Sequence, residues 1–353
     1  MMRRFLSMAT VFLLLAAAAV AGQASTAPQD RPPAQKPPVA QQPPPPAGQQ
    51  QPDLVVTTDL VRMVFTVMTR RQRLITTLQK GDFKVTENGH PQEIVFFGKE
   101  VDLPLRVGVI LDTSNSIRSR LRFEQEAATD FVHNVIRRRK DLAFLMTFDS
   151  DTGVVEDYTD DAGSLSQAIQ RQRAGGGTAL YDAVYFACAE RLMSPPLPRA
   201  GNPEVRKVLV LISDGEDTHS NRARSEAIEI CQRAEASIYA ISTSTDWLAV
   251  SGNRPEKIHK SDGDKVLEQM ADETGGRAFF PYKTDDLAAS FQDIGVELRS
   301  QYSLAYEPRN KINDGKFRHV KIEVPALDGL RVRSRKGYYP NFGKSASAAP
   351  VPR

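Results

Sequence analysis

The sequence reads Arg106-Val-Gly-Val-Ile-Leu-Asp-Thr-Ser-Asn-Ser between residues 106 and 116, and the fold can be inferred from this segment outward. Its first half is a short apolar run, which is typical of a strand buried on both faces of a parallel sheet. Its second half, from Asp112 to Ser116, is a polar loop rich in hydroxyls. A helical pattern follows over residues 123–136. A buried strand that leads through a polar loop into a helix is the repeating unit of an open α/β domain.

The same alternation continues after this unit. Further strands are predicted at 142–148, 208–213 and 237–242. Further helices are predicted at 180–193, 225–234, 265–274 and 285–299. Strands that alternate with helices predict a doubly wound, mostly parallel sheet covered on both faces, here over residues 103–300.

The segments on either side of this domain have a different pattern. Alternating, β-branched runs predict strands at 60–68, 82–87 and 93–97, and again at 301–306, 318–324 and 330–334. Asn88-Gly89 is a strong hairpin signal, so 93–97 is expected to return beside 82–87. Neither segment has enough strands to bury a core alone. We therefore expect residues 54–102 to pair with 301–340 in a small β-sandwich-like domain, into which the α/β domain is inserted.

The ends of the chain have the composition of processing and linking segments. Residues 1–21 have a basic start, an apolar run and small residues at Ala19 and Ala21, which together predict a cleaved signal peptide. A membrane anchor is the alternative, but the apolar run is short for a span. Residues 22–53 form a Pro- and Gln-rich linker, and 341–353 a disordered tail. We expect an exported protein, periplasmic or extracellular, without a transmembrane span after cleavage.

The net charge bears on nucleic-acid binding, and the two cysteines bear on a disulfide. The formal net charge of +3 gives no reason to expect nucleic acid. The one basic run, 137–140, closes a helix, where cations meet the helix dipole favourably.

Cys188 and Cys231 both lie in helical patterns. An exported protein permits a disulfide between them, but two buried thiols fit the sequence as well.

Polar side chains gather where ligands bind in an open parallel sheet, beyond the carboxyl ends of the strands. Asp112, Ser114 and Ser116 follow the strand at 106–111, and Asp214 follows the strand at 208–213. Thr178 ends a flexible Gly-Gly-Gly loop before a helix. Two carboxylates and three hydroxyls are all oxygen donors, which suit Mg²⁺, Mn²⁺ or Ca²⁺ rather than zinc.

The pattern Asp112-x-Ser114-x-Ser116, followed by Thr178 and Asp214, resembles the metal-ion-dependent adhesion site (MIDAS) of the von Willebrand factor type A domains. The resemblance covers about residues 105–300 and leaves none of the five positions substituted. It implies that Ser114, Ser116 and Thr178 ligate a cation directly, while the two aspartates act mostly through water. The flanking segments resemble those of exported von Willebrand type A-related proteins of acidobacteria.

The resemblance implies an adhesion-type module that binds a partner protein. A site with neutral hydroxyl ligands leaves a cation in need of one more oxygen, which an Asp or Glu of the partner can provide. The last predicted helix, 285–299, runs directly into the C-terminal β segment, so we also expect binding to be transmitted to the β strands.

Two other functions compete with this one. A structural envelope protein with a vestigial metal site is the main alternative. A metal-dependent hydrolase is less favoured, since the sequence has no P-loop and no Gly-x-Ser-x-Gly elbow. His133, His219 and His259 lack partners at metal-ligand spacing and are interpreted as surface residues. Asp149-Ser150-Asp151 is interpreted as a solvated turn rather than a second cation site.

Overall fold

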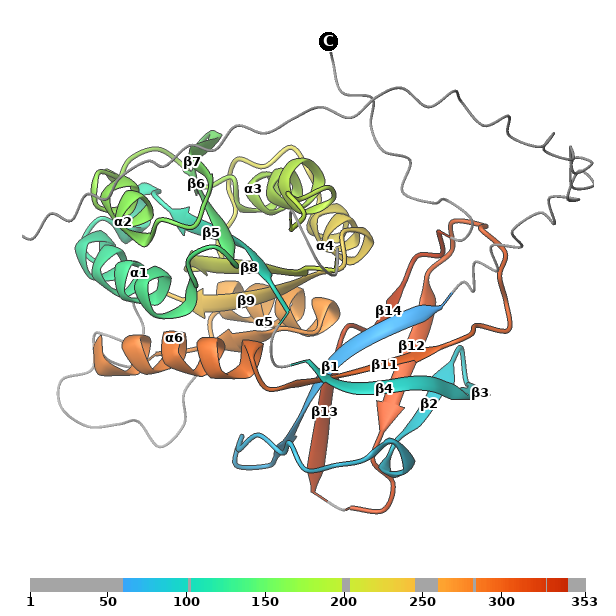
Figure 1. The fold of residues 1–353 in the computed structure, drawn as a ribbon. Helices are drawn as coiled ribbons and strands as arrows, with labels where there is room; N and C mark the ends of the chain where they lie inside the picture. Colours follow the sequence, from blue (N-terminus) through green and yellow to red (C-terminus); the bar gives the residue numbers. More distant parts are fainter. Residues whose placement is uncertain are drawn as a thin grey trace, which may run out of the picture. The chain divides into compact units, whose positions relative to one another are not determined.

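The computed structural model describes most of the 353-residue chain (Figure 1). The described residues are 60–100, 103–198, 204–244, 260–281, 284–327 and 329–341. The predicted signal peptide, the linker and all of the predicted tail after residue 341 lie outside these ranges. Within them, no helix combines the length and the apolar character needed to cross a bilayer.

The centre of the α/β domain is a six-stranded sheet with the order β10-β9-β8-β5-β6-β7. Its strands are β5 (Leu105–Asp112), β6 (Leu142–Phe148), β7 (Thr152–Thr159), β8 (Arg206–Ser213), β9 (Ala236–Ser242) and β10 (Arg277–Phe279). Only β7 is antiparallel to its neighbour among these strands. All eight residues of β5 are buried, because the strand lies in the middle of the sheet with helices on both sides. The predicted fold class, an α/β domain with a doubly wound, mostly parallel sheet, is confirmed.

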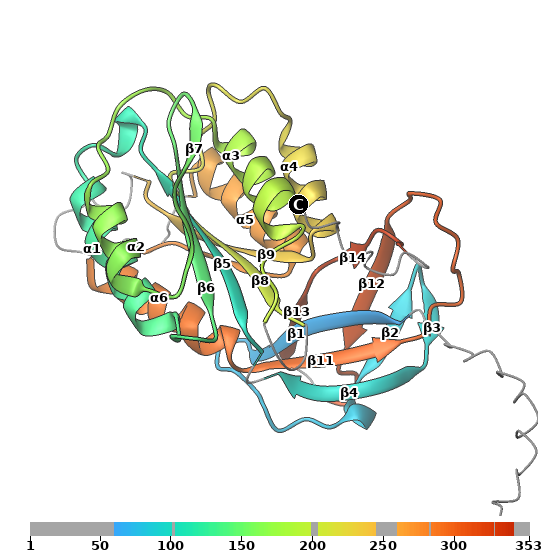
Figure 2. The same ribbon diagram turned by 45° about the horizontal axis from the view of Figure 1, so that its top comes forward.

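Helices cover both faces of this sheet (Figures 1 and 2). One face carries α1 (Leu121–Val135), α2 (Ala162–Gln170) and α6 (Thr284–Leu298). The other carries α3 (Leu180–Phe186), the π-helix Ala187–Leu192, α4 (Arg224–Arg233) and α5 (Asp262–Thr274). Each layer packs its own hydrophobic cluster against the sheet, and Phe131 and Phe291 belong to the first, Cys231 and Met270 to the second.

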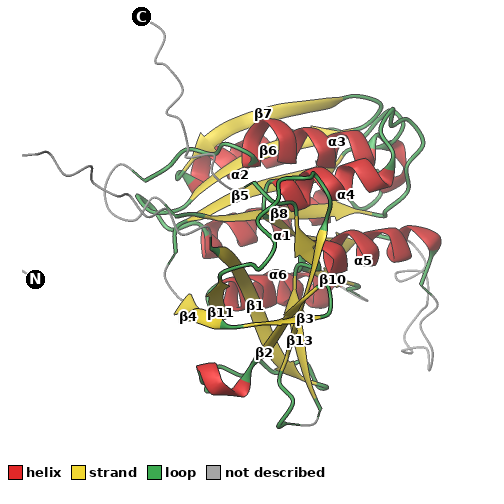
Figure 3. Cartoon of the chain, turned by 90° about the vertical axis from the view of Figure 1, so that its right-hand side faces the viewer, coloured by secondary structure: helices red, strands yellow, loops and turns green. Residues whose placement is uncertain are grey.

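The flanking segments build two antiparallel four-stranded sheets (Figure 3). One has the order β13-β1-β11-β4, formed by β13 (Leu330–Ser334), β1 (Val61–Thr69), β11 (Gln301–Tyr306) and β4 (Ile94–Glu100). The other has the order β14-β12-β2-β3, formed by β14 (Gly337–Tyr338), β12 (Arg318–Glu323), β2 (Lys84–Glu87) and β3 (His90–Gln92). A third hydrophobic cluster, which contains Phe65, Phe83 and Tyr302, draws on both sheets. Strands from before and after the α/β domain therefore share each sheet, with Val61 opposite Tyr306 in the register.

The hairpin prediction is wrong in one respect. The strand that returns after Asn88-Gly89 is β3, which pairs with β2. The segment predicted to return, 93–97, belongs mainly to β4 and pairs instead with β11 in the other sheet. The chain changes sheets at Glu93, because Ile94 contributes its side chain to the shared core.

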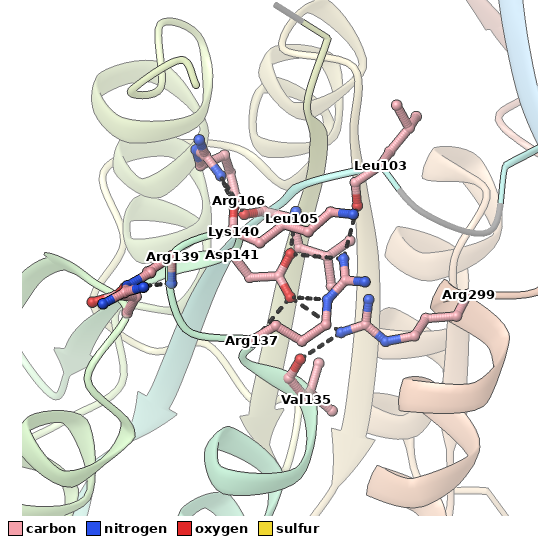
Figure 4. A network of polar contacts seen from close by, with 10 residues as sticks. Leu103, Leu105, Arg106, Val135, Arg137, Arg139, Lys140, Asp141 and Arg299 are labelled. Atoms are coloured by element: carbon pink, nitrogen blue, oxygen red, sulfur yellow. Dashed lines mark hydrogen bonds and ion pairs between the residues drawn. The ribbon is translucent and has the colours of Figure 1, made fainter. Parts of the chain in front are cut away.

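A buried carboxylate ties together the end of the sheet where β5 and β6 begin (Figure 4). Asp141 is fully buried and accepts hydrogen bonds from the Leu105 amide at 2.8 Å and from the Arg137 amide at 3.0 Å. The guanidinium groups of Arg137 and Arg299 reach it at 2.9 and 3.1 Å. Burial alone would raise the pKa of Asp141, but its hydrogen bonds and the charge of Arg137 lower that pKa below the ordinary value. The carboxylate therefore stays ionised and joins the start of β5, the end of α1 and the chain just after α6.

Cys188 and Cys231 form a disulfide, which settles the question that the sequence left open. The bond joins the π-helix after α3 to α4, on the face of the sheet covered by those helices.

Candidate metal centre

Asp112 and Asp214 lie at the ends of two neighbouring strands. Asp112 is the last residue of β5, and Asp214 directly follows β8. β5 and β8 are adjacent and parallel, with Leu111 opposite Ile212. The polar loops that follow these strands therefore meet at the carboxyl edge of the sheet, as the crevice rule for open sheets expects.

Three of the predicted residues form one chain of hydrogen bonds. The hydroxyl oxygens of Ser114 and Ser116 lie 2.9 Å apart. The Ser116 hydroxyl donates to the Asp214 carboxylate at 2.8 Å, and the other Asp214 oxygen accepts from the Glu216 amide at 3.1 Å. Ser114 and Asp214 are buried, whereas Ser116 is exposed, so the cluster opens to solvent on one side.

Asp112 lies next to this chain and is bonded to Ser114 and Ser213. One of its carboxylate oxygens accepts from the Ser114 amide at 2.8 Å, and the other accepts from the Ser213 hydroxyl at 2.7 Å. Burial raises the pKa of Asp112 to about 6, although the bonds from Ser114 and Ser213 act in the opposite direction. The hydrogen-bond donors shown for this buried carboxylate are neutral, and a nearby cation would favour its ionised form.

Thr178 is brought to the same edge by the glycine loop. The Gly175 amide donates to the Thr113 carbonyl at 2.8 Å, and the Asn115 amide donates to the Gly176 carbonyl at 3.3 Å. The Gly177 amide donates to the Ser150 hydroxyl at 2.7 Å. The glycine loop that the sequence predicts to be flexible is thus hydrogen-bonded through its backbone to two neighbouring loops.

Glycine is required at one of these positions by backbone conformation. Gly176 has a φ of +73°, a region that side chains rarely adopt, and it packs against the side chains of Asp149 and Ser150. The Asp149 carboxylate accepts from the Asp151 amide at 3.0 Å, as in an Asx turn. Residues 149–151 thus act as a turn that holds the glycine loop.

Sequence reasoning missed Ser213. Its hydroxyl donates to Asp112 and accepts from the Gly215 amide at 3.1 Å, so it orients both the carboxylate and the loop after β8. The available signal was a polar residue at the end of an otherwise apolar strand, Val208 to Ser213.

The donor set fits a hard divalent cation. Carboxylate and hydroxyl oxygens are the ligands that Mg²⁺ and Mn²⁺ prefer. Within the described ranges, no group of three or more His, Cys, Asp or Glu side chains is placed to hold a metal ion. A cation at this edge would therefore depend on the hydroxyls of Ser114, Ser116 and Thr178 as much as on the two carboxylates.

The doubly wound sheet and the oxygen cluster beyond β5 and β8 define an α/β domain with a candidate cation site. Residues 107–294, more than half of the sequence, match the family model of the von Willebrand factor type A domain, and the chain belongs to this family. The narrower resemblance to acidobacterial proteins stays a prediction. No curated protein matches the sequence.

Several solved structures are similar in fold. A von Willebrand factor type A structure from Catenulispora acidiphila is 12% identical, covers 78% of this chain and 71% of its own, and has a TM-score of 0.45. Proximal thread matrix protein 1 from the mussel byssus, with a zinc-occupied MIDAS motif, is 18% identical over 61% of this chain and 50% of its own, with a TM-score of 0.43. An aerotolerance-related membrane protein from Bacteroides fragilis is 16% identical over 55% of this chain and 98% of its own, with a TM-score of 0.43. At these identities and TM-scores, the similar structures assign no function to this chain.

Proposed function

We propose that the protein is a non-enzymatic binding module, which acts outside the cytoplasm and recognises an acidic group of a partner protein through a divalent cation. One observation carries the proposal, namely the continuous chain of oxygen atoms from Ser114 through Ser116 to Asp214, open to solvent at Ser116. Membership of the von Willebrand factor type A family supports an interaction module in general.

The residues of the cluster take different roles in this proposal. Ser114, Ser116 and Thr178 hold the cation through neutral hydroxyls, while Asp112 and Asp214 balance its charge through water. When bound, the cation supplies a positive centre with a coordination position that an Asp or Glu of the partner completes. Asp112, held from behind by Ser213, fixes the direction of the Ser114 loop.

The disulfide supports export. Disulfides persist in oxidising compartments and are rare in the cytosol. The bond between Cys188 and Cys231 therefore agrees with the predicted signal peptide at 1–21 and with a periplasmic or extracellular location.

The first test is a calorimetric titration of Mg²⁺ and of Mn²⁺ into the mature protein and three variants. Asp112→Ala and Thr178→Ala remove groups contributed by two different loops, and we expect both to abolish one saturable site. Asp151→Ala is the matched control, because it removes an exposed carboxylate from the neighbouring turn and should bind as the wild type does.

Absence of cation binding by the wild-type protein would contradict the proposal and favour the structural alternative. If binding is found, the partner is sought by capture from the exported fraction in Mg²⁺, with release by a chelator. Ser114→Ala should capture nothing. Equal capture by this variant would show that the cation site is not the recognition surface.

A further inference from the structure

The peptide of Thr178 is held by a different loop from the glycines that precede it. Its amide donates to the Thr218 hydroxyl at 3.1 Å. Its carbonyl accepts from the amides of Thr218 and His219 at 2.8 and 3.0 Å. Thr178 is thus attached on both sides of its backbone to the loop that begins with Asp214.

The His219 ring completes this attachment. Its Nδ1 lies 2.8 Å from the Thr218 hydroxyl oxygen. The ring also occupies the space beside Gly177, where a Cβ would come within 2.2 Å of two ring atoms. A side chain at Gly177 would therefore displace the His219 ring, whereas Gly176 is favoured by its positive φ. His219 is exposed, as the sequence predicts for a surface residue. The sequence did not indicate that its ring contacts the glycine loop.

We propose that Thr218 is a positioning residue of the metal centre, which sets the place of Thr178 relative to Asp214. The inference rests on the proposed function, since it assigns Thr218 a part in cation binding without contact to the cation. Thr178 and Asp214 belong to separate loops, and the bonds through Thr218 and His219 join those loops. Loss of this junction leaves the Thr178 hydroxyl in a less defined position.

The hydroxyl of Thr218 makes two hydrogen bonds, one with the Thr178 amide and one with the His219 ring. It accepts from the Thr178 amide and can donate to His219 Nδ1 at the same time, because a hydroxyl has one proton and two lone pairs. Valine has nearly the same shape and offers neither bond. Serine retains both.

The rest of the loop has its own attachments, so a change at Thr218 leaves it folded. The Gly215 amide is bound to the Ser213 hydroxyl, and Ser220 is bound to Asp217 at 2.5 Å. The Asn221 amide donates to the Asp182 carboxylate at 2.9 Å.

The test compares Thr218→Val with Thr218→Ser by titration of Mn²⁺ and Mg²⁺. Groups that orient metal ligands typically contribute 10- to 100-fold in affinity. We expect Thr218→Val to weaken cation binding about tenfold and Thr218→Ser to bind within about twofold of the wild type. Thr159→Val is the matched control. The Thr159 hydroxyl also accepts a hydrogen bond from a backbone amide, that of Asp161. Thr159 lies at the opposite end of the sheet from the site. It should leave the affinity unchanged.

A second readout needs no cation. In the metal-free protein, amide hydrogen exchange at Thr178 should be faster in Thr218→Val and unchanged in Thr218→Ser. Wild-type affinity in Thr218→Val, or equal weakening in both Thr218 variants, would overturn the proposal. If the wild type binds neither cation, the proposed function fails, and the exchange rate of Thr178 alone decides whether Thr218 fixes it.

Discussion

Glu124 is a buried acid that the candidate metal centre does not use. It lies on α1 with its carboxylate buried. It lines a cavity of about 20 Å³ together with Arg120 and Thr243. Burial raises the pKa of Glu124 to about 8, and the negative charges of Asp112 and Asp214 act in the same direction. The charge of Arg120 and a hydrogen bond with Thr243 lower the pKa but do not compensate for burial.

This environment makes the metal-free protein sensitive to alkaline pH. Since folding raises the pKa of Glu124 from 4.5 to about 8, the fold favours the protonated form. The cost of ionising it is absent below about pH 4.5, grows as the pH rises, and is complete above pH 8. A pKa difference of one unit between the folded and unfolded states corresponds to about 1.4 kcal/mol. We expect Glu124→Gln to match the wild type at pH 5 and to be the more stable protein at pH 9.

Denaturant unfolding of the metal-free protein between pH 5 and 9 measures this difference. Glu126→Gln is the control, because Glu126 is exposed on the same helix. The unfolding midpoints of the wild type and of Glu124→Gln are compared at each pH. If both midpoints follow the same course from pH 5 to 9, ionising Glu124 does not destabilise the fold.

At the scale of elements, the disulfide is the strongest constraint on the α3–α4 layer. It closes a loop with a sequence separation of 43 residues. Chain-entropy arguments assign such a loop about 4 kcal/mol of stabilisation. We expect the double variant Cys188→Ser with Cys231→Ser to lose stability on this scale in denaturant unfolding. Its affinity for Mg²⁺ should remain unchanged, because Cys188 and Cys231 lie further along the chain than the loops that lead into α3 and α4, in the π-helix and near the end of α4. An unchanged unfolding midpoint would mean that packing alone holds the two helices together.

The central elements were predictable because each has a complete local pattern. β5 and β8 have apolar runs at 107–111 and 208–212 that lead into polar loops, so the sequence alone placed Asp112 and Asp214 at the same edge. β7 and α2 were not predicted. β7 is an edge strand that exposes Val154 and Val155, which removes the apolar pattern, and α2 is only nine residues long.

The contacts within the site were less predictable than its members. The bonds from Ser213 to Asp112 and from Thr218 to Thr178 join residues 101 and 40 positions apart in the chain. They depend on how two loops meet after folding, and neither has a local sequence signal. The same reason explains why the glycine loop, which looks flexible in sequence, is held by bonds to its neighbours.

For the whole molecule, the end of α6 is the junction between the α/β domain and the β strands. Glu297 is buried, and both of its oxygens accept from Arg333 of β13, at 3.1 and 3.2 Å. One oxygen also accepts from Tyr239 of β9 at 3.3 Å and from Thr66 of β1 at 3.4 Å. A single carboxylate thus connects α6 to both parts of the chain.

The contacts of Glu297 provide a physical route for the expected transmission of cation binding from the α/β domain to the β strands. We expect Mg²⁺ to slow amide exchange in β1 and β13 of the wild-type protein, and Glu297→Gln to abolish that change while its cation affinity stays the same. Hydrogen exchange with and without Mg²⁺ measures both strands. Asp293→Asn is the control, since Asp293 lies on the same helix near Arg277 but is exposed. The same protection in Glu297→Gln as in the wild type would exclude this carboxylate from the coupling.

The order of strands in the first β sheet also determines when that sheet can form. Both neighbours of β1, namely β11 and β13, are encoded after the whole α/β domain. At synthesis rates of roughly 5–20 residues per second, β1 leaves the ribosome tens of seconds before either partner exists. During that time Met63, Phe65 and Val67, all buried in the finished protein, have no sheet to enter. The chain therefore cannot complete its first β sheet until β11 and β13 have been made, and this delay would suit the export proposed above.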